Sequence, residues 1–179
     1  EGTEQLRRYL YYQLIHSMRK ADRIDIIVSF LMESGVKMLL EELKKAMKRG
    51  AKVRILTGNY LGITQPSALY LIKHELGELV DLRFYNERNR SFHPKSYIFH
   101  YADHSEIYIG SSNISRSALT SGIEWNYRFS SHRDPENYEK FYRTFEDLFQ
   151  NHSVVIDDKE LKRYSKTWHR PAASKDLDR

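Results

Sequence analysis

The sequence predicts an α/β protein in which a mixed β-sheet is flanked by helices. Segments typical of strands and helices alternate over residues 24–85, the pattern of parallel strands joined by covering helices. Residues 95–101 and 106–110 then form two strand-like segments separated by four residues. A connection this short favours an antiparallel hairpin, because parallel strands need a long crossover. At 179 residues, the chain has the size of one domain with a substantial core.

The N-terminal part begins with a helix predicted over residues 3–20, because an apolar residue recurs at every fourth position. A strand, a helix, a strand, a loop, a helix and a strand follow. Gly50 suits the C-terminal cap of the first of these helices, and Pro66 suits the first turn of the second. The expected ranges, in that order, are 24–30, 33–49, 52–57, 58–66, 66–76 and 80–85. Nothing in the composition of the loop 58–66 assigns it a role.

The C-terminal part adds a strand over 125–129 and an amphipathic helix over 135–149. Aromatic residues at helical spacing on this helix are expected to pack into the core. They are Tyr138, Phe141, Tyr142, Phe145 and Phe149. Periodicity ends after Lys166, so we interpret residues 1–165 as one domain and 166–179 as a linker. Because the chain begins at Glu1 without an initiator Met, we expect it to be part of a longer protein.

Composition narrows the class of partner. The net charge is +5 and the isoelectric point is near 9.3, which favours a polyanion such as nucleic acid. The chain has no cysteine, which excludes disulfides and thiolate zinc sites and is compatible with a reducing cytoplasm. No apolar run approaches the ~18 residues that a membrane span needs. We therefore expect a cytoplasmic protein with no membrane partner.

Two short motifs indicate phosphodiester chemistry. His93 stands two residues before Lys95 at the start of a predicted strand, and side chains two apart on a strand share a face. The next strand ends in Gly110-Ser-Ser-Asn113, whose hydroxyl, amide and backbone donors suit an anion. A nucleophile, a cation and neutral donors around one point meet the needs of phosphoryl transfer without a metal.

These motifs resemble those of the phospholipase D superfamily, in which His-x-Lys is followed by an Asp and then by Gly-Ser-x-x-Asn. Glu124, eleven residues after Asn113, stands where several nuclease members carry a supporting acid. One position departs: the Asp expected at residue 100 is His100. By strand alternation His100 faces away from Lys95, so we expect a structural role for it.

The resemblance implies a phospholipase D/nuclease-like sandwich with one motif copy, and catalytic roles for five residues. They are His93, Lys95, Ser111, Asn113 and Glu124. In such enzymes one histidine attacks phosphorus, giving a phosphohistidine, and a second protonates the leaving oxygen. No other histidine here has a lysine two residues on. The resemblance therefore implies that either a second domain or a second copy of the chain supplies the other histidine, with a homodimer that completes the active site as the simplest solution. It implies neither a cofactor nor a metal.

Over a longer stretch, the sequence resembles the phospholipase D-like domain at the N-terminus of certain bacterial superfamily-two (DEAD/DEAH-type) DNA/RNA helicases. It covers most of the chain, to about residue 165. The helicase motor is absent, since no Gly-x-x-x-x-Gly-Lys-[Ser/Thr] loop occurs here. The matching segments are 21–30, 53–58, 90–95, 110–119 and 122–126.

Substrate-binding roles are expected for four residues that flank or lie within the motifs: Arg88, Arg90, Ser112 and Arg116.

Other interpretations of the motif residues stay open. Ser111 and Asn113 are also common turn formers, and Glu124 is equally typical of a solvated strand end. A zinc site at His93, His100 and His104 lacks a carboxylate at ligand spacing. A nucleic-acid-binding or dimerisation module without turnover is the alternative to a nuclease, and a lipid-active enzyme is a weaker one.

Overall fold

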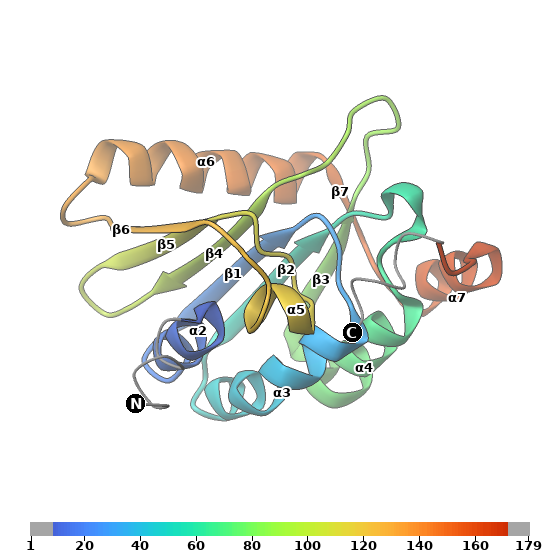
Figure 1. Cartoon of the computed structure of the whole chain (residues 1–179), viewed down its shortest axis with the longest axis horizontal. Coiled ribbons are helices and arrows are strands. Elements are labelled where there is room, and N and C mark those ends of the chain that lie inside the picture. The colour runs from blue at the N-terminus through green and yellow to red at the C-terminus, as the bar shows by residue number, and fades with distance from the viewer. Residues whose placement is uncertain (1–8, 172–179) are drawn as a thin grey trace.

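The computed structural model describes residues 9–171, and a seven-stranded mixed sheet lies at its centre (Figure 1). The strand order is β6-β5-β4-β1-β2-β3-β7. Strands β1, β2 and β3 are parallel, and the remaining strands pair antiparallel to their neighbours. The strand bounds are β1 Arg23–Val28, β2 Lys52–Thr57, β3 Val80–Tyr85, β4 Lys95–His100, β5 Ser105–Gly110, β6 Asn126–Ser130 and β7 Ser153–Val155.

Helices cover both faces of this sheet. The longest helix, α6, lies along one face, and α2, α3 and α4 lie on the other (Figure 1). The α-helix bounds are α2 Leu10–Met18, α3 Glu33–Lys48, α4 Pro66–Leu76, α5 Arg116–Leu119, α6 Pro135–Asn151 and α7 Asp158–Thr167. Two short 3₁₀ helices, η1 Tyr60–Gly62 and η2 Gly77–Leu79, follow β2 and α4.

The two faces hold two apolar clusters, and β1 contributes to both. Ile24 and Ile26 pack with α2, α3 and α4, whereas Ile27 packs with Phe145 and Phe149 of α6. A strand buried on both faces needs an almost continuous apolar run, which explains the sequence of β1. The predicted fold class, a mixed sheet flanked by helices, is confirmed.

Most predicted elements lie within two residues of the observed ones. The predicted N-terminal helix is observed as α2, and its residues 3–8 lie outside the described part of the chain. Three elements escaped prediction: α5, β7 and α7. The first is a single turn, the second has three residues, and α7 buries only Leu161 and Tyr164. None of them has enough apolar periodicity to stand out from a loop.

Two expectations about the C-terminal part need adjustment. The aromatic face of α6 is only partly core: Phe145 and Phe149 are buried, but Phe141 is exposed, with its ring next to Phe129 of the edge strand β6. Within the predicted linker, Trp168 packs against the core, and its indole Nε1 donates to the carbonyl oxygen of Gly62 at 2.6 Å. Residues 172–179 of that linker lie outside the described residues.

Candidate active site

Lys95 is the first residue of β4 and pairs with Val28, the last residue of β1. Its Nζ donates to Ser29 Oγ at 3.1 Å and to the carbonyl oxygen of His93 at 2.8 Å. Burial lowers the pKa of Lys95, and the negative charge of Glu124 opposes this effect. The ammonium group is therefore a partly desolvated cation at the end of the sheet where β1 ends and β4 begins.

His93 precedes β4 and is exposed, and the predicted projection of His93 and Lys95 to one face stays a prediction. Its position comes from the chain on either side. Lys95 holds its backbone carbonyl, and the preceding Phe92 is buried against Gly58. A Cβ at Gly58 would lie 3.0 Å from the Phe92 ring and 2.8 Å from a backbone oxygen. The imidazole lies edge-on to the ring of Tyr60, with 6.2 Å between ring centroids.

The second motif is anchored on the neighbouring strands. Asn113 is buried, and its Oδ1 accepts a hydrogen bond from the backbone N–H of Phe30 at 3.2 Å. Ser111 is exposed; its hydroxyl donates to Glu124 and accepts from the backbone N–H of Trp125 at 3.0 Å. Glu124 thus holds Ser111 and also acts electrostatically on the lysine of the first motif.

Gly110 and Ser112 have structural reasons to occupy their positions. A Cβ at Gly110 would lie 1.9 Å from the carbonyl oxygen of Trp125, so only glycine lets β5 and the start of β6 approach this closely. Ser112 is fully buried: its Oγ accepts from Asn126, and its carbonyl oxygen accepts from the Tyr97 hydroxyl. Burial raises the pKa of Tyr97, so its hydroxyl stays protonated as a donor. The expected substrate contact of Ser112 stays a prediction.

Ser29 was missed by the sequence analysis. Its hydroxyl accepts from Lys95 Nζ and donates to the carbonyl oxygen of Pro94 at 3.3 Å, and the next residue, Phe30, holds Asn113. Residues 29–30 therefore touch both motifs. The signal was available, because a serine that directly follows a buried parallel strand lies at the strand end where α/β proteins place functional groups.

The arginines expected to contact phosphate lie at two places. Arg88 and Arg90 are exposed in the connection between β3 and β4, on the segment that leads to His93. Arg116 is exposed at the start of α5, where its backbone N–H donates to Ser34 and its side chain lines a hollow with Lys37 of α3. Their roles in binding a substrate stay predictions.

His100 lies on the opposite face of the sheet, beneath α6. Its Nε2 is 2.7 Å from Oδ2 of the fully buried Asp25, which Arg54 also holds through two hydrogen bonds of 2.7 and 3.0 Å. Burial acts to raise the pKa of Asp25, but hydrogen bonds from His100 and Arg54 outweigh it and hold that pKa below its ordinary value. Arg54 also pairs with Glu146 of α6. The structural role predicted for residue 100 is confirmed.

This geometry gives the site a definite chemical character. The partly desolvated ammonium group of Lys95 donates to the backbone carbonyl of His93, whose side chain is exposed, and a serine hydroxyl and a buried asparagine come from the adjoining strand end. Such groups can attack and stabilise a phosphoryl centre. Convergence of His93, Lys95, Ser111 and Asn113 on one pocket stays a prediction. Over residues 9–171, no group of three or more His, Cys, Asp or Glu side chains is arranged to hold a metal ion.

A family comparison covers most of the chain. The model of the family described as cardiolipin synthase, PLD-like domain, matches residues 12–152. None of the curated proteins compared with the sequence matches it. Across residues 9–171, no helix combines the length and apolar character that crossing a bilayer needs.

Solved structures share the fold at low sequence identity. NucT from Helicobacter pylori is 18% identical with a TM-score of 0.62, and the match covers 86% of this chain and 94% of NucT. Polyphosphate kinase from Porphyromonas gingivalis is 13% identical with a TM-score of 0.62, and the match covers 84% of this chain but 22% of the kinase. TrmBL2, an archaeal chromatin protein that binds DNA, is 17% identical with a TM-score of 0.53; the match covers 83% of this chain and 50% of TrmBL2.

Proposed function

Because the chain belongs to the family described as cardiolipin synthase, PLD-like domain, we propose that it is a metal-independent phosphodiesterase acting on DNA or RNA. The observation that carries this proposal is the partly buried ammonium group of Lys95, which donates to the backbone carbonyl oxygen of the exposed His93. The net charge of +5 and the exposed Arg88 and Arg90 favour a nucleic acid as substrate. TrmBL2, a DNA-binding chromatin protein of which half matches this chain, supports a ligand of this class.

The reaction has two steps. A nitrogen of His93 attacks phosphorus, and a second histidine gives its proton to the departing ester oxygen. The P–O bond breaks, the alcohol leaves, and a phosphohistidine stays on the protein. Water then attacks phosphorus, its proton passes to the second histidine, and the P–N bond breaks to release a phosphomonoester. Lys95, Ser111 and Asn113 stabilise the negative charge on the phosphoryl oxygens, and Glu124 positions the Ser111 hydroxyl.

The second histidine comes from a second copy of the chain. A twofold dimer brings two His93 residues together with the fewest assumptions. The surface that supports this assembly is the open edge of the sheet at β6, where Trp125 and Tyr127 are 84% and 68% exposed and the adjoining Ile123 is 95% exposed. Solvated monomers seldom leave such apolar groups on an unpaired strand edge. These residues flank Glu124, so an interface here adjoins the site.

We further propose that this domain is the N-terminal module of a DEAD/DEAH-type DNA/RNA helicase, with the domain ending near residue 165. The support is the extended sequence resemblance over segments such as 53–58 and 110–119. The motor would follow in the longer protein.

A second candidate function is nucleic-acid binding or dimerisation without turnover. It is favoured by His100, which replaces the family's aspartate and is committed to Asp25 on the far face of the sheet. TrmBL2, described as a chromatin protein, supports a binding role for this fold.

One experiment separates the two functions. Labelled single- and double-stranded DNA and RNA are incubated with the protein in excess EDTA, and products are resolved by electrophoresis. We expect cleavage, lost by a thousandfold or more in His93→Ala but retained in His74→Ala, a change to an exposed histidine of α4. Cleavage that requires Mg²⁺ and ignores His93 would overturn the proposal. Binding without cleavage would support the second function.

A further inference from the structure

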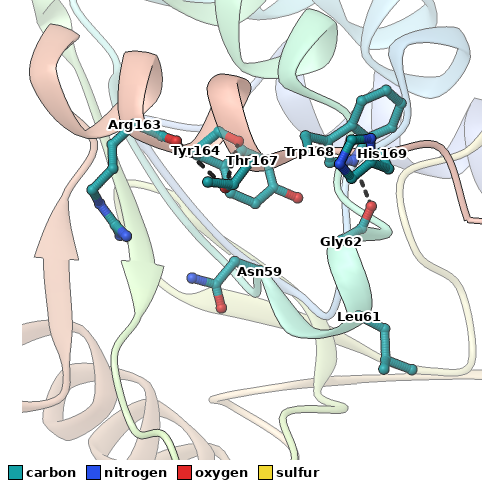
Figure 2. Close-up of a pocket in the computed structure, with 8 residues that line it drawn as sticks. All are labelled: Asn59, Leu61, Gly62, Arg163, Tyr164, Thr167, Trp168 and His169. Carbon is teal, nitrogen blue, oxygen red and sulfur yellow. Dashed lines mark hydrogen bonds between the residues drawn. The ribbon is translucent and has the colours of Figure 1, made fainter.

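A hollow of about 450 Å³ lies between η1 and α7 (Figure 2). Asn59, Leu61 and Gly62 form one wall, and Arg163 and Thr167 of α7 lie opposite (Figure 2). Tyr164, Trp168 and His169 complete the lining. The volume is within the ordinary range for small-ligand pockets.

The hollow and the active site share one short segment. Tyr60 stands between Asn59 and Leu61, which line the hollow, and its ring contacts the imidazole of His93. The residue before this segment, Gly58, donates its backbone N–H to the carbonyl oxygen of Ser29 at 3.1 Å, and Ser29 in turn contacts the motif lysine. The short helix η1 therefore carries both a neighbour of His93 and part of the wall of the hollow.

The wall is built in advance of any ligand. Thr64 is buried and donates to the carbonyl oxygen of Gly58 at 2.6 Å, while Tyr164 donates to the carbonyl oxygen of Thr64 at 2.5 Å. Leu61 adopts a left-handed backbone conformation, with φ 54°, and its side chain is 67% exposed. A leucine in this conformation, presenting its side chain to solvent, is strained in a way that is concentrated at functional sites.

The lining has the chemistry of a nucleotide site. The flat indole of Trp168 offers a surface on which a base can stack, and Asn59 and Thr167 offer hydrogen-bonding groups. Leu61 adds an exposed apolar side chain that points away from α7 (Figure 2). The Arg163 guanidinium donates hydrogen bonds to the Glu160 carboxylate from Nε and Nη2. The two donors on its Nη1 take no part in these bonds. An acyl chain would instead need a continuous apolar wall.

We propose that this hollow binds a nucleotide of a single-stranded nucleic acid, adjacent to the phosphate held at His93. The strand must be single because a base can enter only when it is unpaired and unstacked. This inference rests on the proposed function for its ligand class. It adds a subsite outside the two motifs and makes η1 and α7 determinants of which strand is bound.

The test measures binding in a background without cleavage. In His93→Ala protein, we titrate a fluorescein-labelled single-stranded oligonucleotide by fluorescence polarisation and compare Leu61→Asn and Arg163→Gln with Arg143→Gln. Arg143 is the matched control, since it is exposed on α6 and pairs with a glutamate on its own helix, as Arg163 does. Asparagine tolerates a left-handed backbone, so Leu61→Asn removes the apolar side chain without new strain.

We expect Kd to rise about fivefold or more in each hollow variant and about 10- to 100-fold in the double variant, with no more than a twofold change in the control. Thermal melts confirm that all variants are folded. Equal affinities in the hollow and control variants would overturn the subsite. The subsite would also be overturned if the hollow variants bound the oligonucleotide normally but lost binding to phosphatidylglycerol vesicles. EDTA-resistant cleavage by the protein with His93 intact is measured separately, so that failure of the proposed function is distinguishable from failure of the subsite.

Discussion

Replacing Asp25 by asparagine tests the ion cluster that fastens α6 to the sheet. The carboxylate is fully buried and accepts hydrogen bonds from Arg54, and it lies 2.7 Å from His100 Nε2. Removing one partner of a buried ion pair costs about 3–5 kcal/mol, because the other charge loses its counter-charge. Arg54 keeps its pair with Glu146, so we expect the lower end, about 3 kcal/mol.

The size of the chain converts this free energy into a melting temperature. For a protein of 179 residues, each 1 kcal/mol shifts Tm by about 2–4 °C, so Asp25→Asn should lower Tm by roughly 6–12 °C. Urea unfolding followed by circular dichroism supplies the free energy itself. Asp158→Asn is the control, because the Asp158 side chain is 97% exposed and its ion pair contributes little.

The difference in the free energy of unfolding between wild type and Asp25→Asn should also depend on pH. The pKa of Asp25 is held below its ordinary value in the folded protein, so its contribution is complete above the unfolded pKa of about 3.9. That contribution is lost as the pH falls through the folded pKa. The two proteins should therefore differ fully at pH 7 and converge at strongly acidic pH. Equal stability of Asp25→Asn and the control at pH 7 would refute this account of the cluster.

The other predictions concern the active site. Gly110→Ala should displace the following turn and lower activity at least tenfold, because the new Cβ meets a backbone oxygen of the next strand; a crystal structure with that turn unmoved would contradict this. The double change Arg88→Ala and Arg90→Ala should weaken binding and reduce the slope of log Kd against log salt by roughly two, as measured by titration at several salt concentrations. Activity should fall at alkaline pH, below the ordinary lysine value near 10.4, because burial lowers the pKa of Lys95 and the cation is lost as pH rises through it; a profile flat to pH 11 would exclude this role. Mixed dimers of wild-type and His93→Ala chains should be nearly inactive, and a fully active monomer by light scattering would rule out the shared site.

Much of the fold could be predicted because the sheet is built from strong local signals. The strands 52–57 and 80–85 and the helix 66–76 agree with the sequence analysis at both ends. Each has a regular apolar pattern, and a Gly or Pro bounds the first strand and the helix. The terminal helix α7 escaped because its contact with the core depends on two side chains in a mostly charged segment. Such a helix is stabilised by tertiary packing, which has little local signature.

The site was predictable in its residue types and less so in its geometry. Strand periodicity anticipated the orientation of His100, because that residue lies inside β4. It does not extend to His93, which lies before the strand and is placed by Phe92, Gly58 and the Lys95 ammonium group, so the predicted shared face of His93 and Lys95 stays a prediction. Ser29 follows a buried strand, which was a usable signal, but its hydrogen bond with Lys95 joins residues 66 apart in sequence and has no local pattern.

The position of β1 between β2 and β4 has a consequence for the order of folding. On one side β1 meets β2, the next strand along the chain; on the other it meets β4, so that Arg23 and His100 are 77 residues apart in sequence. Closing so long a loop is slow, and a growing chain must extend past β4 before that side of β1 can pair. Until then the apolar edge of β1 can pair with other chains, so the risk of aggregation and the benefit of a chaperone are greatest during this interval.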